Sequence, residues 1–205
     1  MKSAVDALAN EPDMVEIIVG QMGKGVDMGE KKQMSKRAGT MVSIEKLLDS
    51  IGVDAARFFL VDRSHDSTLD LDLEKAKLKS EENPVYYVQY AHARICSILR
   101  KAETEMAEVP SDSTYDAVAD QERDLILKLL EFPLAVQMAA ENRGPQRLTA
   151  YARELAATFH TFYHNCPVIK AAPATASFRI DLCSLTRNVI SSCLNLVGVS
   201  APESM

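Results

Sequence analysis

The sequence predicts a mainly α protein, in which a helical bundle follows a short remnant of an α/β domain. Two observations support this fold class. Apolar residues recur at helical spacing in successive segments from residue 43 to residue 197, and Gly and Pro separate these segments. By contrast, only residues 14–19 read as a strand, and a short helical pattern over residues 1–10 precedes them.

The composition is that of an ordinary globular chain. Its 205 residues are 47% hydrophobic and 25% charged. No run of 18 apolar residues is present, so we expect no membrane span, and the first residues lack the apolar core of a secretory signal. The four cysteines form no C-x-x-C pair, which predicts free thiols and a cytoplasmic location.

The formal net charge of −6 is distributed unevenly along the chain. Residues 103–124 hold eight acidic side chains and one Arg, whereas residues 24–37 hold five basic and two acidic side chains. Residues 143–205 hold six basic and three acidic side chains. Because the negative charge is concentrated in one segment, basic surfaces remain available for a polyanionic partner.

The N-terminal half is expected to contain a loop and several short helices. Residues 20–40 hold five glycines and a cluster of lysines, which predicts a flexible basic loop. Helices are expected over residues 44–51, 54–62 and 72–80, with a polar turn over residues 63–70. Gly52 is a natural end for the first of these helices, and Ala55, Phe58, Phe59 and Leu60 are the expected apolar anchors of the second.

The C-terminal half is predicted to be a bundle. A long helix should begin at Pro84, since proline suits the first helical position, and continue to about Lys101. An acidic connector follows over residues 104–114, and further helices are expected over residues 115–131, 133–142, 146–164 and 176–197. The expected buried side of the last helix consists of Ile180, Cys183, Leu185, Val189, Ile190 and Leu194.

The long helix has two different faces. One apolar stripe predicts a core contact and consists of Val88, Ala91, Ile95, Ile98, Leu99 and Ala102. A neighbouring stripe carries Tyr87, Tyr90, Arg94 and Lys101, and Arg100 lies further round the helix. Periodicity leaves two interpretations of this second stripe. The tyrosines are half-buried beside solvated charges, or the stripe is a surface on which unpaired RNA bases stack.

The loop at Gln33–Thr40 (QMSKRAGT) is a candidate phosphate-binding segment. A lysine in a glycine-flanked loop between a strand and a helix can reach a polyphosphate, and Lys36 has this position. The alternative interpretation is a solvated basic loop without a ligand.

This loop resembles the KMSKS signature of class I aminoacyl-tRNA synthetases, in the form found in arginyl-tRNA synthetases. The strings VSIEKLLDSIG, NPVYYVQYAHAR, FHTFYHNCPVI and LVGVSAPESM are similar to the same family. Asp54–Arg57 (DAAR) has the place of the D-A-L-R string that names the anticodon-binding domain of the family. Two positions depart from the pattern: Gln33 replaces the first Lys of KMSK, and Ala56 replaces the Leu of D-A-L-R.

The resemblance implies three parts. Residues 1–42 would be a remnant of the Rossmann catalytic domain with the KMSK-like loop, residues 43–80 connecting helices, and residues 81–205 the DALR anticodon-binding bundle of a class Ia synthetase. The H-x-G-H motif of the catalytic domain does not occur in the sequence. The chain is therefore expected to be a C-terminal fragment that is inactive by itself.

The resemblance also implies an activity for the intact enzyme. An arginine–tRNA ligase converts ATP, L-arginine and tRNA(Arg) into AMP, diphosphate and L-arginyl-tRNA(Arg), with Mg²⁺ accompanying the nucleotide. Lys36 would be the catalytic residue, stabilising charge on the ATP phosphates, and the ATP-binding loop would be Met34, Ser35, Lys36 and Arg37. The implied anticodon-binding residues are Tyr87, Tyr90, Arg94, Arg100, Tyr163 and Met205, with cytosine as the central anticodon base and a monomer as the expected state.

Other interpretations are a free-standing RNA-binding module related to this domain and a structural bundle that binds no RNA. His160 and His164 share a helix face near Cys166, which raises a metal site as a further possibility. No fourth ligand follows at zinc-like spacing, so we expect no metal there.

Overall fold

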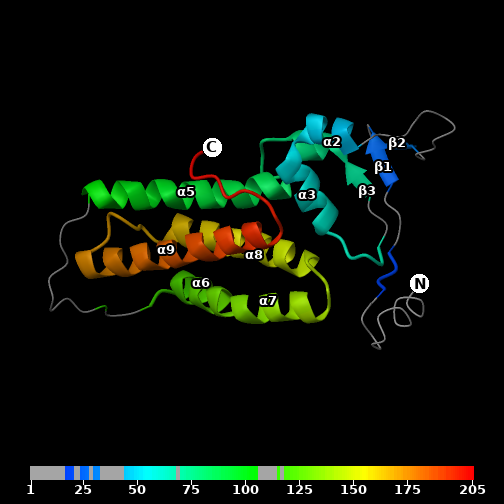
Figure 1. Cartoon of the computed structure of the whole chain (residues 1–205). Coiled ribbons are helices and arrows are strands. Elements are labelled where there is room, and N and C mark those ends of the chain that lie inside the picture. Colours follow the sequence, from blue (N-terminus) through cyan, green and yellow to red (C-terminus); the bar gives the residue numbers. More distant parts are fainter. Residues whose placement is uncertain are drawn as a thin grey trace.

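The computed structural model of the chain describes residues 17–20, 24–27, 30–32, 44–67, 70–105, 115 and 118–205. These residues form a helical body with a small sheet at one end (Figure 1). The elements are β1 (Lys24–Asp27), β2 (Glu30–Lys32), α2 (Ile44–Ile51), α3 (Val53–Val61), β3 (Asp70–Asp72), α4 (Leu73–Lys77), α5 (Pro84–Glu105), α6 (Asp120–Leu130), α7 (Phe132–Glu141), α8 (Gln146–Asn165) and α9 (Pro173–Leu196). The predicted mainly helical fold class is confirmed. Within the described ranges, no helix is long and apolar enough to cross a membrane.

The small sheet differs from the sequence prediction. β1 and β2 pair antiparallel within the segment expected to be a flexible loop, and β3 pairs parallel to β1 on its other edge. Residues 17–20 form no strand, and the rest of the strand predicted over residues 14–19 lies outside the described residues, as does the helix predicted over residues 1–10. Local patterning missed this sheet because its strands are short and one of its two pairings joins distant segments.

Asn83 fixes the junction between α4 and the long helix α5. Its buried side-chain amide donates hydrogen bonds to the carbonyl oxygens of Ala76 and Leu78, both at 2.9 Å. Its own side-chain oxygen accepts from the backbone N–H of Val85 at 3.3 Å. Pro84 then begins α5 as predicted. One side chain therefore satisfies backbone groups on both sides of the turn.

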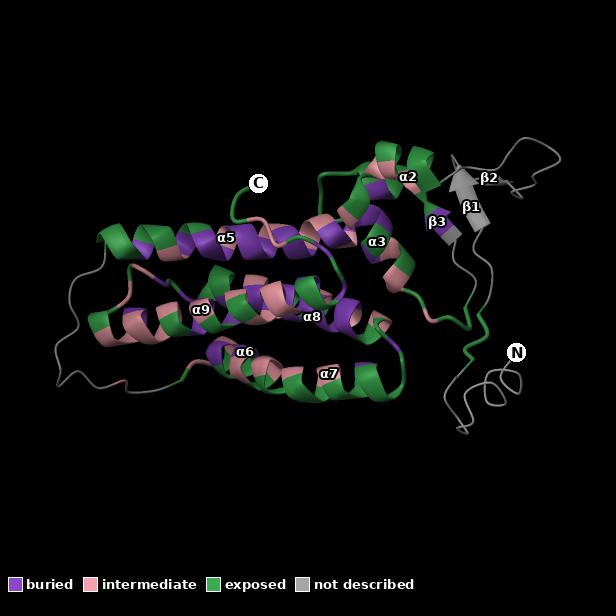
Figure 2. Cartoon of the chain, in the orientation of Figure 1, coloured by how far each residue is buried: buried purple, intermediate pink, exposed green. Residues whose placement is uncertain are grey.

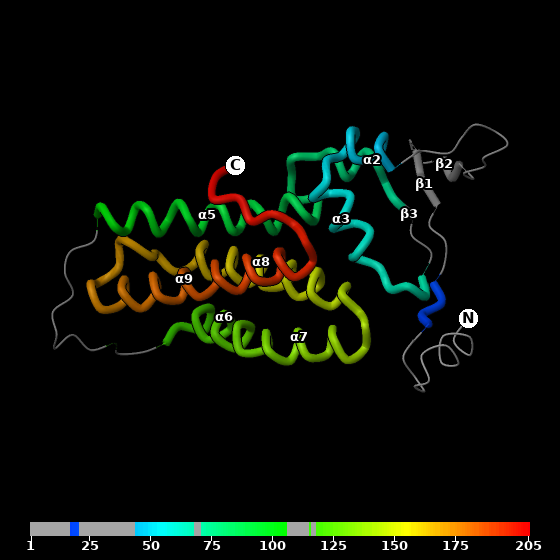
Figure 3. The backbone as a smooth tube through the Cα atoms, in the orientation of Figure 1, coloured from blue at the N-terminus to red at the C-terminus, as the bar shows by residue number. Residues whose placement is uncertain are grey.

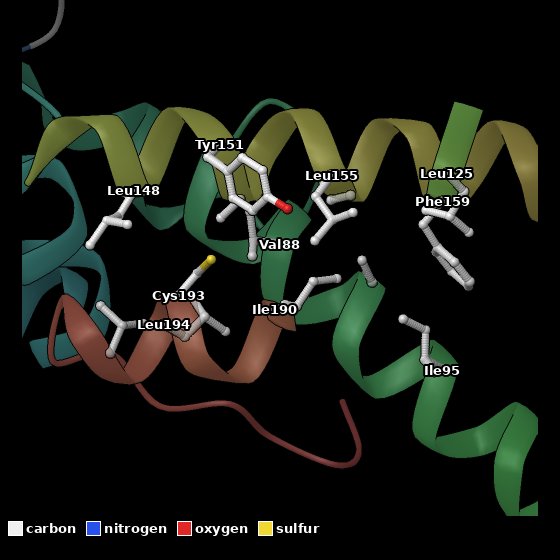
Figure 4. Close-up of a cluster of buried hydrophobic side chains, with 14 of the residues drawn as sticks. Val88, Ile95, Leu125, Leu148, Tyr151, Leu155, Phe159, Ile190, Cys193 and Leu194 are labelled. Carbon is white, nitrogen blue, oxygen red and sulfur yellow. The ribbon is translucent and has the colours of Figure 1, made fainter. Parts of the chain in front are cut away.

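The core of the bundle lies between α5, α8 and α9, and α8 also contacts α6 and α7 (Figure 1). Buried residues line the inner faces of these helices, as Figure 2 shows. In Figure 4, Val88 and Ile95 of α5 point toward Leu155 of α8 and Ile190 of α9. Each of these four side chains is 0% exposed, and burial of such a side chain contributes about 1.5–3 kcal/mol.

Most of the predicted core positions are buried, and the others fall into two groups. Four are only partly buried: Phe59, Leu99, Ile180 and Val189. Leu60 and Leu185 are 46% and 56% exposed and are wrong as core residues. On α9, Leu182 and Thr186 occupy the buried side, and Leu185 lies about a third of a turn from its centre. The apolar pattern of this helix is broad enough to fit more than one face, and packing against α5 and α8 selects one.

Candidate nucleic-acid interface

An aromatic and cationic cluster lies on α5, on three successive turns. The rings of Tyr86 and Tyr90 are nearly parallel, with centroids 6.1 Å apart and an interplanar angle of 7°. The guanidinium carbon of Arg94 lies 4.7 Å from the centroid of the Tyr90 ring, and its Nη2 donates to the Tyr90 hydroxyl at 2.6 Å. This spacing of four residues follows from the helical repeat, which places i and i+4 side chains over one another.

The neighbouring helix α8 extends this cluster. The Arg94 guanidinium also lies 5.7 Å from the ring of Tyr163, and the ring of His160 lies 6.3 Å from that of Tyr90. Phe159, which is 0% exposed, supports Tyr163 from the core side, with ring centroids 5.9 Å apart. Arg94 is thus held between two tyrosine rings from different helices. A guanidinium plane and half-exposed aromatic rings are the groups on which unpaired bases stack.

A cavity of about 800 Å³ opens beside this cluster, between the C-terminal half of α5, α8 and the segment that follows α8. Its charged lining groups are mostly basic, with Arg94, Lys101 and Lys170 against one carboxylate, Glu81. The remaining lining includes His160 and Tyr163 together with apolar residues. A concave site with a basic rim and aromatic walls suits a nucleotide better than an apolar ligand.

A second, smaller cavity of about 260 Å³ lies on the other side of Arg94. Tyr90, Arg94 and Arg100 line it from α5, and Met205 lines it from the end of the sequence. Met205 is 55% exposed. The two cavities share Arg94, so a ligand in either one meets the same guanidinium group.

The ionisation of this face follows from burial. Burial lowers the pKa of His160 below its usual 6.5, Arg94 lowers it further, and Glu81 opposes the shift. His160 is therefore neutral at pH 7. Burial raises the pKa of Tyr87, with Glu81 adding to the shift. His160 therefore adds no charge to the face at neutral pH, whereas Arg94, Lys101 and Lys170 do not titrate near pH 7.

The structure brings together most of the anticodon candidates named from the sequence. Tyr90, Arg94, Arg100, Tyr163 and Met205 all line one of the two cavities. Tyr87 lines neither of them. Its ring is partly buried and packs against His160, with centroids 5.2 Å apart.

The predicted ATP-binding loop lies outside the described residues, and one basic residue of the cavity was not predicted. Met34, Ser35, Lys36 and Arg37 lie outside the described residues. Lys170 was not a candidate, because it follows α8 in a loop without helical periodicity and only the fold brings it to α5. Within the described ranges, no group of three His, Cys, Asp or Glu side chains could hold a metal ion.

Comparisons with known proteins identify the family of the chain. Residues 88–205 match the family described as the DALR anticodon binding domain. Over its whole length the chain is 41% identical to an arginine–tRNA ligase of Staphylococcus epidermidis and 45% identical to one of Symbiobacterium thermophilum. The chain spans only 37% of the length of each relative.

Solved structures show the same relationship. A Campylobacter jejuni structure assigned to the arginyl-tRNA synthetases superposes with a TM-score of 0.83 at 30% identity, covering 100% of this chain and 44% of the other. The arginyl-tRNA synthetase of Thermus thermophilus superposes with a TM-score of 0.72 at 27% identity, covering 90% of this chain and 34% of the other.

Fold and comparisons together define a helical bundle of the anticodon-binding type, similar to the corresponding part of solved arginyl-tRNA synthetases. The chain belongs to the DALR anticodon-binding domain family. Asp54–Arg57, the DAAR string, lies on α3, and Ala56 is 1% exposed, so the position that carries Leu in the family string is a core position here.

Proposed function

We propose that the chain is the tRNA anticodon-binding part of an arginine–tRNA ligase. The observation that carries this proposal is the Arg94 guanidinium, which is held between the rings of Tyr90 and Tyr163 and lines two cavities, the larger of them mostly basic. Bases of an anticodon loop can be splayed out and stacked on such groups. The whole-length similarity to arginine–tRNA ligases supports tRNA(Arg) as the partner.

The remaining assignments extend the same proposal. Residues 81–205 form the binding bundle, residues 43–80 connect it to the catalytic side, and residues 1–42 belong to the catalytic domain. In the intact enzyme, ATP with Mg²⁺ and L-arginine are the other substrates, and Lys36 with Met34, Ser35 and Arg37 contacts the ATP phosphates. We propose a cytoplasmic monomer, and the four free, buried cysteines are consistent with a reducing compartment.

A titration with a tRNA(Arg) transcript tests the proposal. We expect the chain to bind tRNA(Arg) more tightly than a transcript with a changed central anticodon base, by roughly 1–3 kcal/mol, because a different base cannot make the same edge hydrogen bonds and leaves polar groups unpaired. Fluorescence anisotropy at fixed salt measures both dissociation constants. Equal affinity for the two transcripts would contradict anticodon reading.

Variants of the cluster identify the surface that binds. Arg94→Ala should weaken binding of tRNA(Arg) by about 1–3 kcal/mol and leave the circular dichroism spectrum unchanged. Arg147→Ala is the matched control. Arg147 is an exposed arginine at the start of α8, about 24 Å along the helix from Tyr163. An equal loss of affinity in both variants would point to non-specific electrostatic binding.

A further inference from the structure

The segment that follows α9 is anchored to α3 by Asp54 and Arg57, the two charged residues of the DAAR string. Asp54 Oδ1 accepts a hydrogen bond from the backbone N–H of Ser200 at 3.1 Å, and Asp54 Oδ2 accepts one from the Ser200 hydroxyl. Arg57 Nε donates to the carbonyl oxygen of Val197 at 2.6 Å. Gln89 of α5 donates both to Asp54, at 2.8 Å, and to the Ser200 carbonyl, at 3.0 Å.

The same segment then runs back along α5, as Figure 3 shows. The buried side chain of His92 donates from Nδ1 to the Pro202 carbonyl at 2.8 Å. Two turns further along α5, Arg100 Nη2 donates to the Glu203 carbonyl at 3.3 Å. Met205, two residues after Glu203, lines the smaller cavity with Tyr90 and Arg94.

Gly198 lies directly against the side chain of Arg57. It has a φ of +70°, a conformation in which glycine is strongly favoured. A Cβ atom at this position would lie 2.2 Å from Arg57 Nε, so no other residue fits without displacing the arginine. The turn that leads out of α9 and the Arg57 side chain therefore depend on each other.

Most of these hydrogen bonds end on backbone atoms of the segment. Its path is consequently fixed by hydrogen bonds with Asp54, Arg57, Gln89 and His92, together with the buried side chains of Val197 and Val199, which are 3% and 2% exposed. Residues 204 and 205 carry no such contact in the described structure and are exposed, so their position follows from the anchored residues before them. The segment thus connects the anchoring residues on α3 with the cavity that Met205 lines.

We propose that Asp54 and Arg57 are positioning residues for anticodon recognition, which they support by holding residues 197–203 so that Met205 closes the cavity beside Tyr90 and Arg94. This inference rests on the proposed function. Neither residue lines that cavity, so they act through the segment and not by touching RNA.

The first experiment measures anticodon preference, defined as the ratio of dissociation constants for the central-base variant and tRNA(Arg). We expect Asp54→Ala to reduce this preference by about fivefold or more, because one base contact is misplaced. Arg57→Met should do the same. Arg57→Lys should retain most of the preference, since lysine still donates one hydrogen bond to the Val197 carbonyl.

Asp62, the C-cap residue of α3, provides a matched control. Its carboxylate accepts from Thr149 Oγ1 at 2.7 Å and pairs with Arg153 at 3.1 Å, and so joins α3 to α8 without contacting residues 197–205. Asp62→Ala should lower the thermal midpoint as Asp54→Ala does, but leave the preference unchanged. Equal losses of preference in both variants would reduce Asp54 to a general stabilising role and overturn the inference.

A second experiment asks whether Asp54 acts through the end of the segment. Deletion of Ser204 and Met205 should lower the preference by itself. In that background, Asp54→Ala should cause no further loss, because the residue that it positions is gone. An undiminished effect of Asp54→Ala in the deleted chain overturns the inference.

A third measurement needs no RNA and separates the inference from the proposed function. Carboxypeptidase release of Met205, followed by mass spectrometry, should be faster in Asp54→Ala than in the unaltered chain. Faster release with an unchanged preference overturns the positioning role. If the unaltered chain shows no anticodon preference, the proposed function is contradicted. The rate of Met205 release still shows in that case whether Asp54 anchors the segment.

Discussion

His160 has a ring nitrogen, Nε2, that is buried and has no hydrogen-bond partner within the described residues. The ring lies between Tyr87 and Tyr90, at centroid distances of 5.2 and 6.3 Å. A buried polar atom without a partner costs about 1–3 kcal/mol, yet the position borders the larger cavity. We interpret this nitrogen as a group that lowers stability in the free chain and becomes satisfied when RNA or water reaches it.

Replacement of His160 by Phe tests this cost. His160→Phe should raise the free energy of unfolding by up to about 1 kcal/mol at pH 7, since the ring stays and the unpaired nitrogen is removed. The pKa of His160 is lower in the folded chain, so below the unfolded value of 6.5 the unfolded state binds an extra proton. Stability of the unaltered chain should therefore fall as pH decreases below about 6.5, and His160→Phe should remove part of that fall.

Urea unfolding at pH 7 and pH 5.5 measures both effects. His164→Phe is the control, because His164 lies one turn further on α8 and is exposed. It should change stability by no more than about 0.5 kcal/mol at either pH. A destabilised His160→Phe variant would show that the imidazole makes a stabilising contact.

At the scale of elements, Glu122 joins the start of α6 to α9 and to the segment after α8. Its carboxylate is 0% exposed, accepts from Arg179 Nε at 2.6 Å and from the Ala119 N–H at 2.7 Å, and is hydrogen-bonded by the Tyr115 hydroxyl. Arg179 also donates to the Pro167 carbonyl at 2.6 Å. Burial alone would raise the pKa of Glu122, but these hydrogen bonds lower it below its usual value.

Glu122→Gln should therefore destabilise the chain by about 3 kcal/mol, because it leaves the guanidinium of Arg179 largely buried without its counter-ion. The folded pKa of Glu122 is depressed, so its contribution is present above the unfolded value of about 4.5 and is lost as pH falls below it. The variant should accordingly lose less stability on acidification than the unaltered chain does.

Glu154→Gln supplies the comparison for this prediction. Glu154 of α8 also pairs with a residue of α6, Lys128, at 2.6 Å, but its side chain is 63% exposed. Its removal should cost less than about 1 kcal/mol. Similar losses in the two variants, measured by urea unfolding, would show that burial does not strengthen the Glu122 pair.

The starts of several helices could be predicted from the sequence, whereas the start of α6 could not. α5, α7 and α8 begin within one residue of their predicted positions, because apolar periodicity and proline mark them. α6 begins at Asp120 and not at Tyr115, since Tyr115 stacks on Phe178 of α9 at 4.4 Å and its hydroxyl bonds Glu122. That contact spans more than 60 residues of sequence, and local patterning carries no information about it.

Some residues of the candidate site could be identified from the sequence and others could not. Tyr90 and Arg94 could be identified because both lie on one helical stripe, and the family resemblance favoured RNA contact over burial. Tyr87, on the same stripe, is partly buried, since α8 places His160 against it. Lys170 and the anchor at Asp54 depend on the approach of distant segments, which periodicity does not encode.

At the scale of the whole molecule, a chain of net charge −6 is proposed to bind a polyanion. The described basic groups at the two cavities are Arg94, Arg100, Lys101 and Lys170. Each phosphate neutralised on single-stranded RNA contributes a slope of about −0.7 to the dependence of log affinity on log salt concentration. Four such contacts predict a slope of about −3, which is shallow for a nucleic-acid-binding protein.

Salt titrations of tRNA(Arg) binding test this prediction between about 50 and 300 mM KCl, the range in which such slopes are defined. Lys170→Gln and Lys101→Gln should each make the slope shallower by about 0.7, whereas Lys77→Gln should not, because Lys77 lies on α4 and lines neither cavity. A slope of about −6 or steeper in the unaltered chain would contradict the prediction, since it requires more basic contacts than this face provides. The number of phosphates held, and not the net charge of the chain, then determines how tightly the bundle binds.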